Sequence, residues 1–233
     1  MKKNVLRLLA LLFAALLCYS TYRVWCINKD YRAEAEIHGQ VLEYRPRPED
    51  PVNQSVIDLQ EKYPDVVGWL TVPNTSIDYP FVWYKDNDYY LRRNLDGEDA
   101  TAGTLFMDCR CQADFTSPNT IIYGHHMKNG SMFGTLKAFA DGDFFAANPR
   151  GAVYLPRETL VLEFFAYLVV NHTDQEIYGV GLSESYLAYV KRNARQYRDI
   201  GLADGDRIAT LSTCSYEFND ARMVLLARVV PSD

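Results

Sequence analysis

The chain has 233 residues, of which 48% are hydrophobic, and this length suits one sizeable domain plus a short appendage. A formal net charge of −6 and the lack of any dense Lys/Arg stripe argue against a nucleic-acid-binding surface. The 17 tyrosines favour a β-rich fold over a helical bundle, because aromatic side chains are enriched in strands.

The N-terminus combines a basic segment, MKKNVLR, with an uncharged and mostly apolar run from Leu8 to Tyr22. This run is somewhat shorter than the ~20 residues of a spanning helix, but Val24–Ile27 extends its apolar character. A cleaved signal peptide is the alternative, although the match to a cleavage site is weak. We favour an uncleaved membrane anchor over residues 1–27. The charges on its two flanks are nearly balanced and leave its orientation open.

Residues 28–54 predict a polar helical stalk, up to about residue 42, and then a linker. The linker sequence EYRPRPEDP contains three prolines, which cannot lie inside a helix and therefore mark a boundary. After the boundary, Ser55 is the candidate N-cap of a short helix that extends to Tyr63. We expect one β-rich domain over residues 55–233.

Short β-branched and aromatic runs bounded by turn residues predict strands from Val66 onward. VVGWLTV and SIDYPFV, separated by Pro-Asn-Thr, predict a hairpin. Further strand candidates are GTLFMDC, NTIIYGH, AVYLP, TLVLEFFAYLVV, DRIATLST and ARMVLLARVV. One helix, capped by Ser183 and extending to about Arg198, is predicted between them. Short strands at this spacing are typical of a β-barrel or a sandwich.

The stretch TLSTCSYEFNDAR contains a candidate nucleophile. Cys214 ends one predicted strand, and Arg222 begins the next. If the two strands pair antiparallel, these residues lie close together in space. A guanidinium beside a thiolate lowers the thiol pKa and can stabilise the oxyanion that forms when sulfur attacks a carbonyl. Taken alone, the two residues are better explained as a buried cysteine and a surface arginine.

A thiol nucleophile needs an acid and base, and the chain has 4 histidines. His38 lies in the predicted stalk, and His172 follows a predicted strand and can simply mark its end. His125 and His126 follow the strand NTIIYG and precede a loop, where catalytic groups are often found. Cysteine, histidine and a carbonyl-stabilising group together suit acyl transfer through a thioester. Seen alone, a surface loop histidine is the alternative.

Metal and phosphatase chemistry fit these residues less well. Adjacent histidines on a strand point in opposite directions, so His125 and His126 cannot easily share one zinc ion with Cys214. A C-x5-R phosphate loop is also a poor match, because the spacing here is C-x7-R and the loop is acidic and lacks glycine. Cys109 and Cys111 have no second pair of ligands at suitable spacing. We therefore expect no metal and no other cofactor.

The motif TLSTC, followed by an arginine at the start of the next strand, resembles the active-site signature of sortases. The sequence YGHHM is similar to the Gly-His strand end of that family. The resemblance covers roughly residues 55–230. Within it, GWLTVPNTSIDYPFV and DNDYYLRRNLDGEDATAGTLFMD resemble class B sortases in particular, as does a long helix between the last strands.

The resemblance implies a mainly β fold, an eight-stranded β-barrel with N-terminal helices and one long helix before the last strands. It implies that Cys214 is the nucleophile, His125 the acid and base, and Arg222 the donor to the oxyanion. His125 matches the family because it directly follows Gly124. Sortases are membrane-anchored cysteine transpeptidases of Gram-positive bacteria, so a single-pass anchor in the cell membrane and a catalytic domain on the extracellular side are also implied.

The implied substrates are surface proteins with a sorting signal of the LPxTG, NPxTN or PxTG kind and an amine of a peptidoglycan precursor. The enzyme would cleave after Thr and transfer the acyl group from the thiol to that amine. Ser212, Thr213 and Tyr123 are candidate substrate-binding residues, because they flank the proposed catalytic groups. Ordinary strand packing also explains these three residues.

Three alternatives to a sortase stay open from the sequence. An L,D-transpeptidase carries Ser-x-Gly-Cys, which the Ser-Thr-Cys of this chain does not match. A cysteine protease would resolve the same thioester with water, and dependence on an added amine separates the two. An inactive membrane-tethered β-domain would have no chemical reason to keep Cys214, His125 and Arg222 together.

Overall fold

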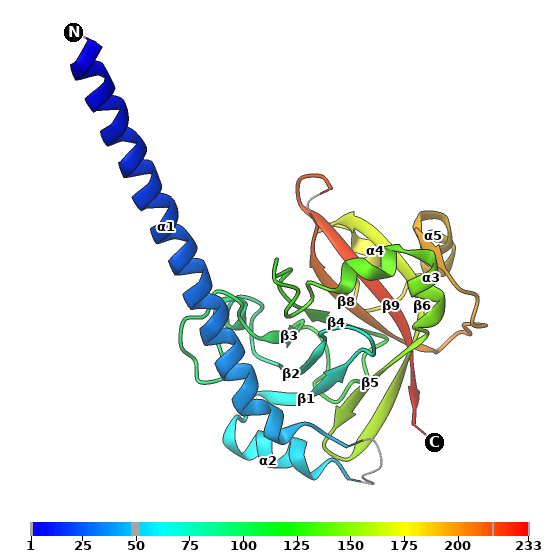
Figure 1. The fold of residues 1–233 in the computed structure, drawn as a ribbon. Coiled ribbons are helices and arrows are strands. Elements are labelled where there is room, and N and C mark those ends of the chain that lie inside the picture. The colour runs from blue at the N-terminus through cyan, green and yellow to red at the C-terminus, as the bar shows by residue number, and fades with distance from the viewer. Residues whose placement is uncertain (1, 48–51, 216, 233) are drawn as a thin grey trace.

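The computed structural model describes residues 2–47, 52–215 and 217–232; two of the predicted linker prolines, Pro48 and Pro51, lie outside these ranges. Its strands are β1 (Val66–Thr71), β2 (Asp78–Val82), β3 (Leu105–Met107), β4 (Asn119–Tyr123), β5 (Arg150–Leu155), β6 (Glu158–Asn171), β7 (Gln196–Tyr197), β8 (Arg207–Cys214) and β9 (Ala221–Pro231). Among the described residues, eight strands close a barrel in the order β5-β1-β2-β3-β4-β8-β9-β6, because β5 also pairs with β6 (Figure 1). The predicted fold class is confirmed, as a barrel and not a sandwich.

Strand pairing follows the predicted pattern with one local difference. The hairpin of β1 and β2 is present and antiparallel, with Thr71 opposite Asp78. β3 is shorter than the run GTLFMDC predicts, because Asp108 leaves the strand and binds a nearby arginine. The long β6 pairs with both β5 and β9, and a bulge between Phe164 and Ala166 bends it between these two partners.

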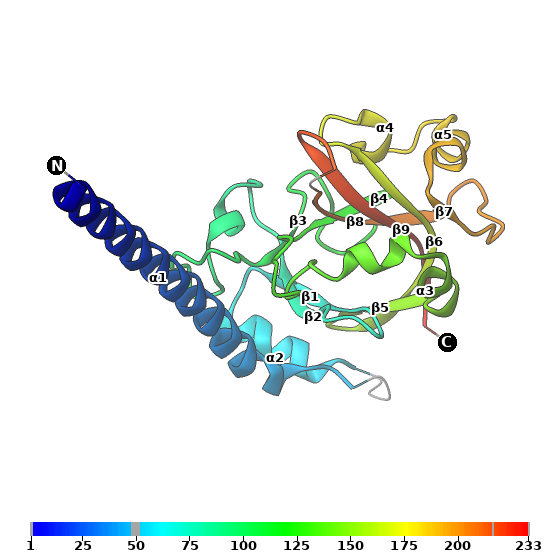
Figure 2. The same ribbon diagram turned by 45° about the horizontal axis from the view of Figure 1, so that its top comes forward.

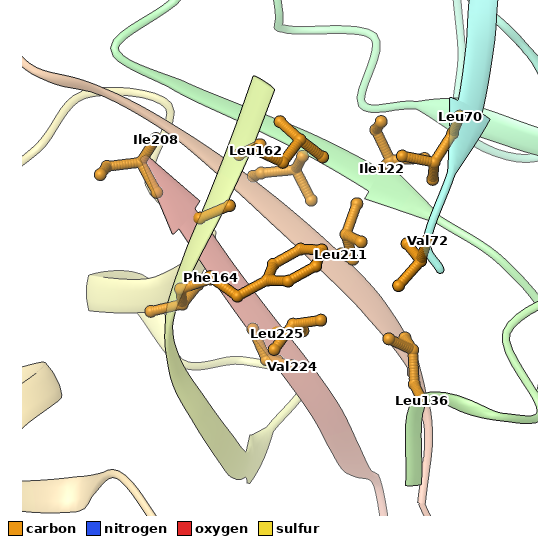
Figure 3. Packing of buried hydrophobic residues seen from close by; sticks show 14 of the residues in the cluster. Leu70, Val72, Ile122, Leu136, Leu162, Phe164, Ile208, Leu211, Val224 and Leu225 are labelled. Atoms are coloured by element: carbon orange, nitrogen blue, oxygen red, sulfur yellow. The ribbon is translucent and has the colours of Figure 1, made fainter. Parts of the chain in front are cut away.

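Apolar side chains that point inward from the strands fill the barrel. Figure 3 shows the ring of Phe164 among Leu162, Leu211 and Leu225, which come from three different strands. All four side chains are fully buried. Burying each side chain of this size contributes about 1.5–3 kcal/mol, so this interior stabilises the barrel while its rim stays free for chemistry.

Helix α1 (Lys2–Val41) joins the predicted anchor and the predicted stalk in one continuous helix. Its N-terminal part extends away from the barrel (Figure 1), and its length and composition would allow it to cross a membrane. Its C-terminal part packs on the barrel. The rings of His38 and Tyr79 lie 4.2 Å apart, and Thr101 Oγ1 donates a hydrogen bond to Asp30 Oδ2 at 3.1 Å. The stalk is therefore docked on the barrel along its last three turns.

The short helix after the linker is α2 (Gln54–Lys62), and Val56 and Leu59 form its buried face. The prediction that Ser55 caps this helix is wrong, because Ser55 lies inside the helix and Asn53 occupies the N-cap position. The helix begins there because the buried Asn53 side chain is anchored to carbonyl groups at the turn between β5 and β6.

The helix predicted from Ser183 to about Arg198 is present but shorter, since α5 spans Tyr186–Asn193 and its N-cap is Ser185. The predicted length is wrong because the chain after α5 pairs with β6, where Gln196 lies opposite Tyr167. Strand pairing thus overrides the helical pattern. Figures 1 and 2 show α1 and α5 on opposite sides of the barrel. The other helical segments are Leu42–Tyr44, η2 (Tyr89–Arg92), Leu136–Ala140, α3 (Gly142–Ala147) and α4 (Gln175–Tyr178).

Candidate active site

The ends of β4 and β8 bring His125 and Cys214 to one rim of the barrel. The two strands run parallel with Tyr123 opposite Ser212, and the N–H of Gly124 donates to the carbonyl of Ser212 at 3.1 Å. His125 lies two residues beyond Tyr123, and Cys214 lies two residues beyond Ser212. Steps of two residues return to the same face of a sheet. The two side chains accordingly line the same cleft.

The pairing of β8 with β9 places Arg222 directly opposite Cys214. Side chains of directly opposite residues project to the same face, with Cβ atoms about 4.5–5.5 Å apart. The Cys214 side chain is exposed, and the half-buried Arg222 donates from Nη1 to the carbonyl of Ala221 at 3.1 Å. Although they are eight residues apart in the sequence, these two residues are therefore neighbours across one hairpin.

A cleft of about 410 Å³ surrounds these groups. One side of it consists of the strand ends, and the other side consists of η2 and the connection between β6 and β7. Its lining residues are Asn87, Asp88, Leu91, Phe106, Tyr123, Gly124, His125, His172, Tyr178, Ser212, Thr213, Cys214 and Arg222. The cleft thus includes all six residues that the sequence assigns to catalysis and substrate binding.

His125 lies in an environment that disfavours its charged form. Burial lowers the pKa of His125, and the positive charge of Arg92 on η2 acts in the same direction. The neutral imidazole is therefore favoured at neutral pH, and it can take up a proton when a thiol or an amine releases one. The carbonyl of His125 accepts a hydrogen bond from the N–H of Phe133 at 3.0 Å, which holds the main chain beyond the strand.

Packing explains why a glycine, Gly124, precedes His125. A Cβ atom at this position would overlap with Leu105 Cδ2 and would lie 2.8 Å from two ring atoms of Phe133, both of which are fully buried. No larger residue fits without displacing these side chains, so the Gly-His sequence has a packing origin that is independent of the histidine chemistry.

The side chain of His126 contacts the main chain of the candidate nucleophile, Cys214. The Nδ1 atom of His126 lies 3.0 Å from the carbonyl oxygen of Cys214. Burial lowers the pKa of His126. The two adjacent histidines thus have different positions: His125 lines the cleft, whereas His126 contacts the main chain at the end of β8. The sequence did not indicate this second contact.

The three predicted substrate-binding residues lie at the base of the cleft. Ser212 is buried, and its Oγ lies 2.8 Å from the hydroxyl of Tyr178. Tyr123 donates a hydrogen bond to Asp108 Oδ2 at 2.9 Å, and burial together with this carboxylate raises the pKa of Tyr123. Thr213 is also buried, and within the described part of the chain its Oγ1 has no hydrogen-bond partner. Their role in binding substrate stays a prediction.

Sequence patterns did not identify Tyr178 and His172 as cleft residues. Tyr178 ends α4, and its ring stacks on Tyr123 with centroids 6.3 Å apart. Burial raises the pKa of Tyr178 to about 12, so its hydroxyl stays protonated at neutral pH. His172 directly follows β6, as predicted, but it also lines the cleft. Neither residue has a local pattern that separates it from the other tyrosines and strand ends of the chain.

Comparison with known proteins identifies the family. A family model described as a sortase domain matches residues 70–230. Sortase B of Listeria monocytogenes is 39% identical over 188 residues, which cover 77% of this chain and 75% of that protein.

Solved structures agree with this match. A Bacillus anthracis protein similar to sortase B superimposes with a TM-score of 0.76 at 33% identity, covering 87% of this chain and 98% of that one. A Staphylococcus aureus sortase B–substrate complex gives a TM-score of 0.75 at 25% identity, covering 88% of this chain and 99% of that one. The chain therefore belongs to the sortase family, as a sortase-type cysteine transpeptidase similar to the class B members.

Proposed function

We propose that the chain cleaves a C-terminal sorting signal after its Thr residue and joins the surface protein to an amine of cell-wall peptidoglycan. The observation that supports this most strongly is the strand register. It sets Cys214 opposite Arg222 and at the same level as His125, inside one cleft. A thiol, an acid and base, and a cation are the groups that acyl transfer needs.

In the first step, the thiol of Cys214 gives its proton to the neutral imidazole of His125, and the resulting thiolate attacks the carbonyl carbon of the Thr residue to form a C–S bond. The carbonyl oxygen becomes an oxyanion, which the guanidinium of Arg222 stabilises from the neighbouring strand. The C–N bond then breaks, and protonated His125 gives its proton to the leaving amine. The product is a thioester between Cys214 and the surface protein.

In the second step, the amine of the peptidoglycan precursor attacks the thioester carbonyl. His125 now accepts a proton from the attacking nitrogen, and the C–S bond breaks as the new peptide bond forms. This leaves Cys214 as a thiolate and His125 as an imidazolium, and return of the proton to sulfur restores the neutral pair that began the cycle. Ser212, Thr213 and Tyr123, at the base of the cleft, would contact the sorting peptide.

The N-terminal region is proposed to hold the enzyme at its site of action. Residues 1–27 would form a single-pass anchor in the cell membrane, with the barrel on the extracellular side. Residues 28–54 would form the stalk and linker, and residues 55–233 the catalytic domain. The apolar, exposed N-terminal part of α1 supports this arrangement.

The test uses the full chain in detergent micelles with a library of quenched fluorescent Pro-x-Thr pentapeptides. Wild type and Cys214→Ala are compared, each with and without oligoglycine or diaminopimelate as the amine. We expect cleavage after Thr that depends on Cys214, and a ligated product that depends on the amine. Cleavage that never yields ligated product would make the protein a thiol protease instead.

A further inference from the structure

The wall of the cleft opposite the strand ends is fixed to the barrel by one buried asparagine. Asn119, at the start of β4, donates from Nδ2 to the carbonyls of Ile177 at 3.0 Å and Gly179 at 2.8 Å. Its own N–H donates to the carbonyl of Val180 at 3.0 Å. Three carbonyls within four residues of the β6–β7 connection therefore bind a single barrel residue.

The chemistry of Asn119 is specific to this role. Its side chain is fully buried, and its Oδ1 accepts a hydrogen bond from Thr210 Oγ1 at 2.7 Å. The amide thus uses two donors and one acceptor at once. Aspartate has the same shape but no donors, and it would place a carboxylate beside carbonyl oxygens. Only an amide side chain satisfies all of these partners.

An arginine binds the remaining carbonyl of this segment. Arg110 donates from Nη2 to the carbonyl of Tyr178 at 3.0 Å, and its Nε and Nη2 bind Asp108 at 2.8 and 2.7 Å. Asp108 is buried and also accepts the hydroxyl hydrogen bond of Tyr123. Although burial acts to raise the pKa of Asp108, its hydrogen bonds with Arg110 hold that pKa below its usual value. One ion pair therefore links both walls of the cleft.

The consequence concerns the position of Tyr178. Helix α4 has only four residues, which is too short to be stable on its own. The ring of Tyr178 nevertheless lines the cleft and stacks on Tyr123, and its hydroxyl meets Ser212. Its place is set by two residues: Asn119 binds the carbonyls on both sides of it, and Arg110 binds the carbonyl of Tyr178 itself.

We propose that Asn119 and Arg110 are positioning residues for the sorting peptide. They hold the segment that contains Tyr178 at a fixed distance from the strand ends, and they do not touch the reacting atoms. This inference rests on the proposed function, because it assumes that the cleft binds the peptide. It predicts that loosening either residue weakens peptide binding more than it slows the chemistry.

The chain offers a matched control on another side of the barrel. Asn53 is also buried, and its Nδ2 likewise donates to two carbonyls, those of Leu155 at 2.6 Å and Glu158 at 3.1 Å. It is the N-cap of α2 and is not among the residues that line the cleft. Figure 1 shows α2 and α4 at different sides of the barrel. Asn53→Asp and Asn119→Asp therefore make the same chemical change in two places, only one of which holds the cleft wall.

The test compares wild type, Asn119→Asp, Arg110→Lys and Asn53→Asp as full chains in micelles. Arg110→Lys keeps a cation beside Asp108 but lacks the planar fork that reaches two partners, so it tests the inference even if Asn119→Asp fails to fold. For the fastest peptide of the Pro-x-Thr library, we expect KM to rise about tenfold in Asn119→Asp and about threefold in Arg110→Lys, with kcat within about twofold of wild type. Asn53→Asp should lower Tm and leave KM unchanged.

Amide hydrogen exchange over residues 172–195 gives a readout that does not depend on turnover. Exchange should accelerate there in the two cleft variants and stay at the wild-type rate in Asn53→Asp. Unchanged KM and unchanged exchange in the cleft variants would overturn the inference while leaving the proposed function intact. Failure of wild type to turn over any peptide would refute the proposed function itself.

Discussion

On one side of the cleft, Cys214, His125 and Arg222 lie at the ends of barrel strands, and main-chain hydrogen bonds set their spacing. On the other side, Tyr178 lies in a connection whose main chain is held by the side chains of Asn119 and Arg110. Substituting any one of these three catalytic candidates changes the chemistry without moving the backbone. A substitution on the second side moves the wall without touching the chemistry. Substitutions on the first side should therefore change mainly kcat, and substitutions on the second side should change mainly KM.

Removing the sulfur should have the largest effect. Cys214→Ala deletes the proposed nucleophile at an exposed position, so kcat should fall by ~10⁴-fold or more, while Tm stays near that of wild type. Peptide turnover and thermal melting measure the two quantities. Cys109→Ala, a free cysteine outside the cleft lining, is the control and should keep full activity. Substantial turnover by Cys214→Ala would disprove the assignment.

Substitution of Arg222 should have the second largest effect, again as a fall in kcat. Arg222→Gln removes the cation opposite Cys214, and kcat should fall by ~10²–10³-fold as an oxyanion donor is lost. Arg222→Lys should lie between that variant and wild type. Steady-state kinetics check this, with Arg150→Gln, an exposed arginine of β5, as the control. A rise in KM with unchanged kcat would instead place Arg222 in substrate binding.

Gly124→Ala tests whether packing positions His125. The added Cβ would displace buried side chains, so we expect a loss of about 1–3 kcal/mol in the free energy of unfolding. We also expect about a tenfold loss of kcat/KM, because the main chain before His125 must shift. Denaturant unfolding and kinetics provide the measurements. Gly181→Ala, with no atom within 4 Å of the new Cβ, should change neither.

Tyr178→Phe examines the second wall with a smaller change. It deletes the hydroxyl that meets Ser212 at 2.8 Å and keeps the ring, so about 1 kcal/mol of stability should be lost and KM should rise a few-fold. The control is Tyr186→Phe in the same connection, since the buried hydroxyl of Tyr186 has no partner among the described residues. Equal kinetic effects from the two variants would contradict a specific role for Tyr178.

The smallest expected effect concerns pH. Burial and the charge of Arg92 both lower the pKa of His125, so Arg92→Gln should raise that pKa and increase the imidazolium fraction at neutral pH. An NMR titration of the His125 ring measures this shift directly. Arg93→Gln is the control, because Arg93 stacks on Tyr89, 4.7 Å from its ring centroid. An unchanged or lower His125 pKa in Arg92→Gln would contradict the electrostatic account.

The strands, and the hairpin that carries Cys214 and Arg222, were predictable because they depend on local sequence patterns. Runs rich in apolar and β-branched residues and bounded by turn residues marked β8 and β9, and antiparallel pairing alone was enough to expect Arg222 beside Cys214. The resemblance of short motifs supplied the choice of a barrel over a sandwich. The position of His125 relative to Cys214 required the parallel pairing of β4 with β8, which joins segments far apart in the chain.

The errors share a physical cause, which is that long-range contacts override local patterns. The chain after α5 pairs with β6 although its sequence suits a helix. The first turn of α2 is set by Asn53 and its partners at the turn between β5 and β6, about 100 residues along the chain, and not by Ser55. Asn119 and Tyr178 escaped notice for the same reason, since their partners lie about 60 residues away in the chain or on another element.

Intact-mass analysis of the enzyme during turnover tests the central claim most directly. Wild type would be mixed with its fastest peptide in the absence of amine, quenched in acid and digested to locate any acyl adduct. We predict a thioester at Cys214 that accumulates without amine and disappears, with formation of ligated product, when diaminopimelate or oligoglycine is added. Cleavage of the peptide with an adduct on another residue, or undiminished cleavage in Cys214→Ala, would contradict the account.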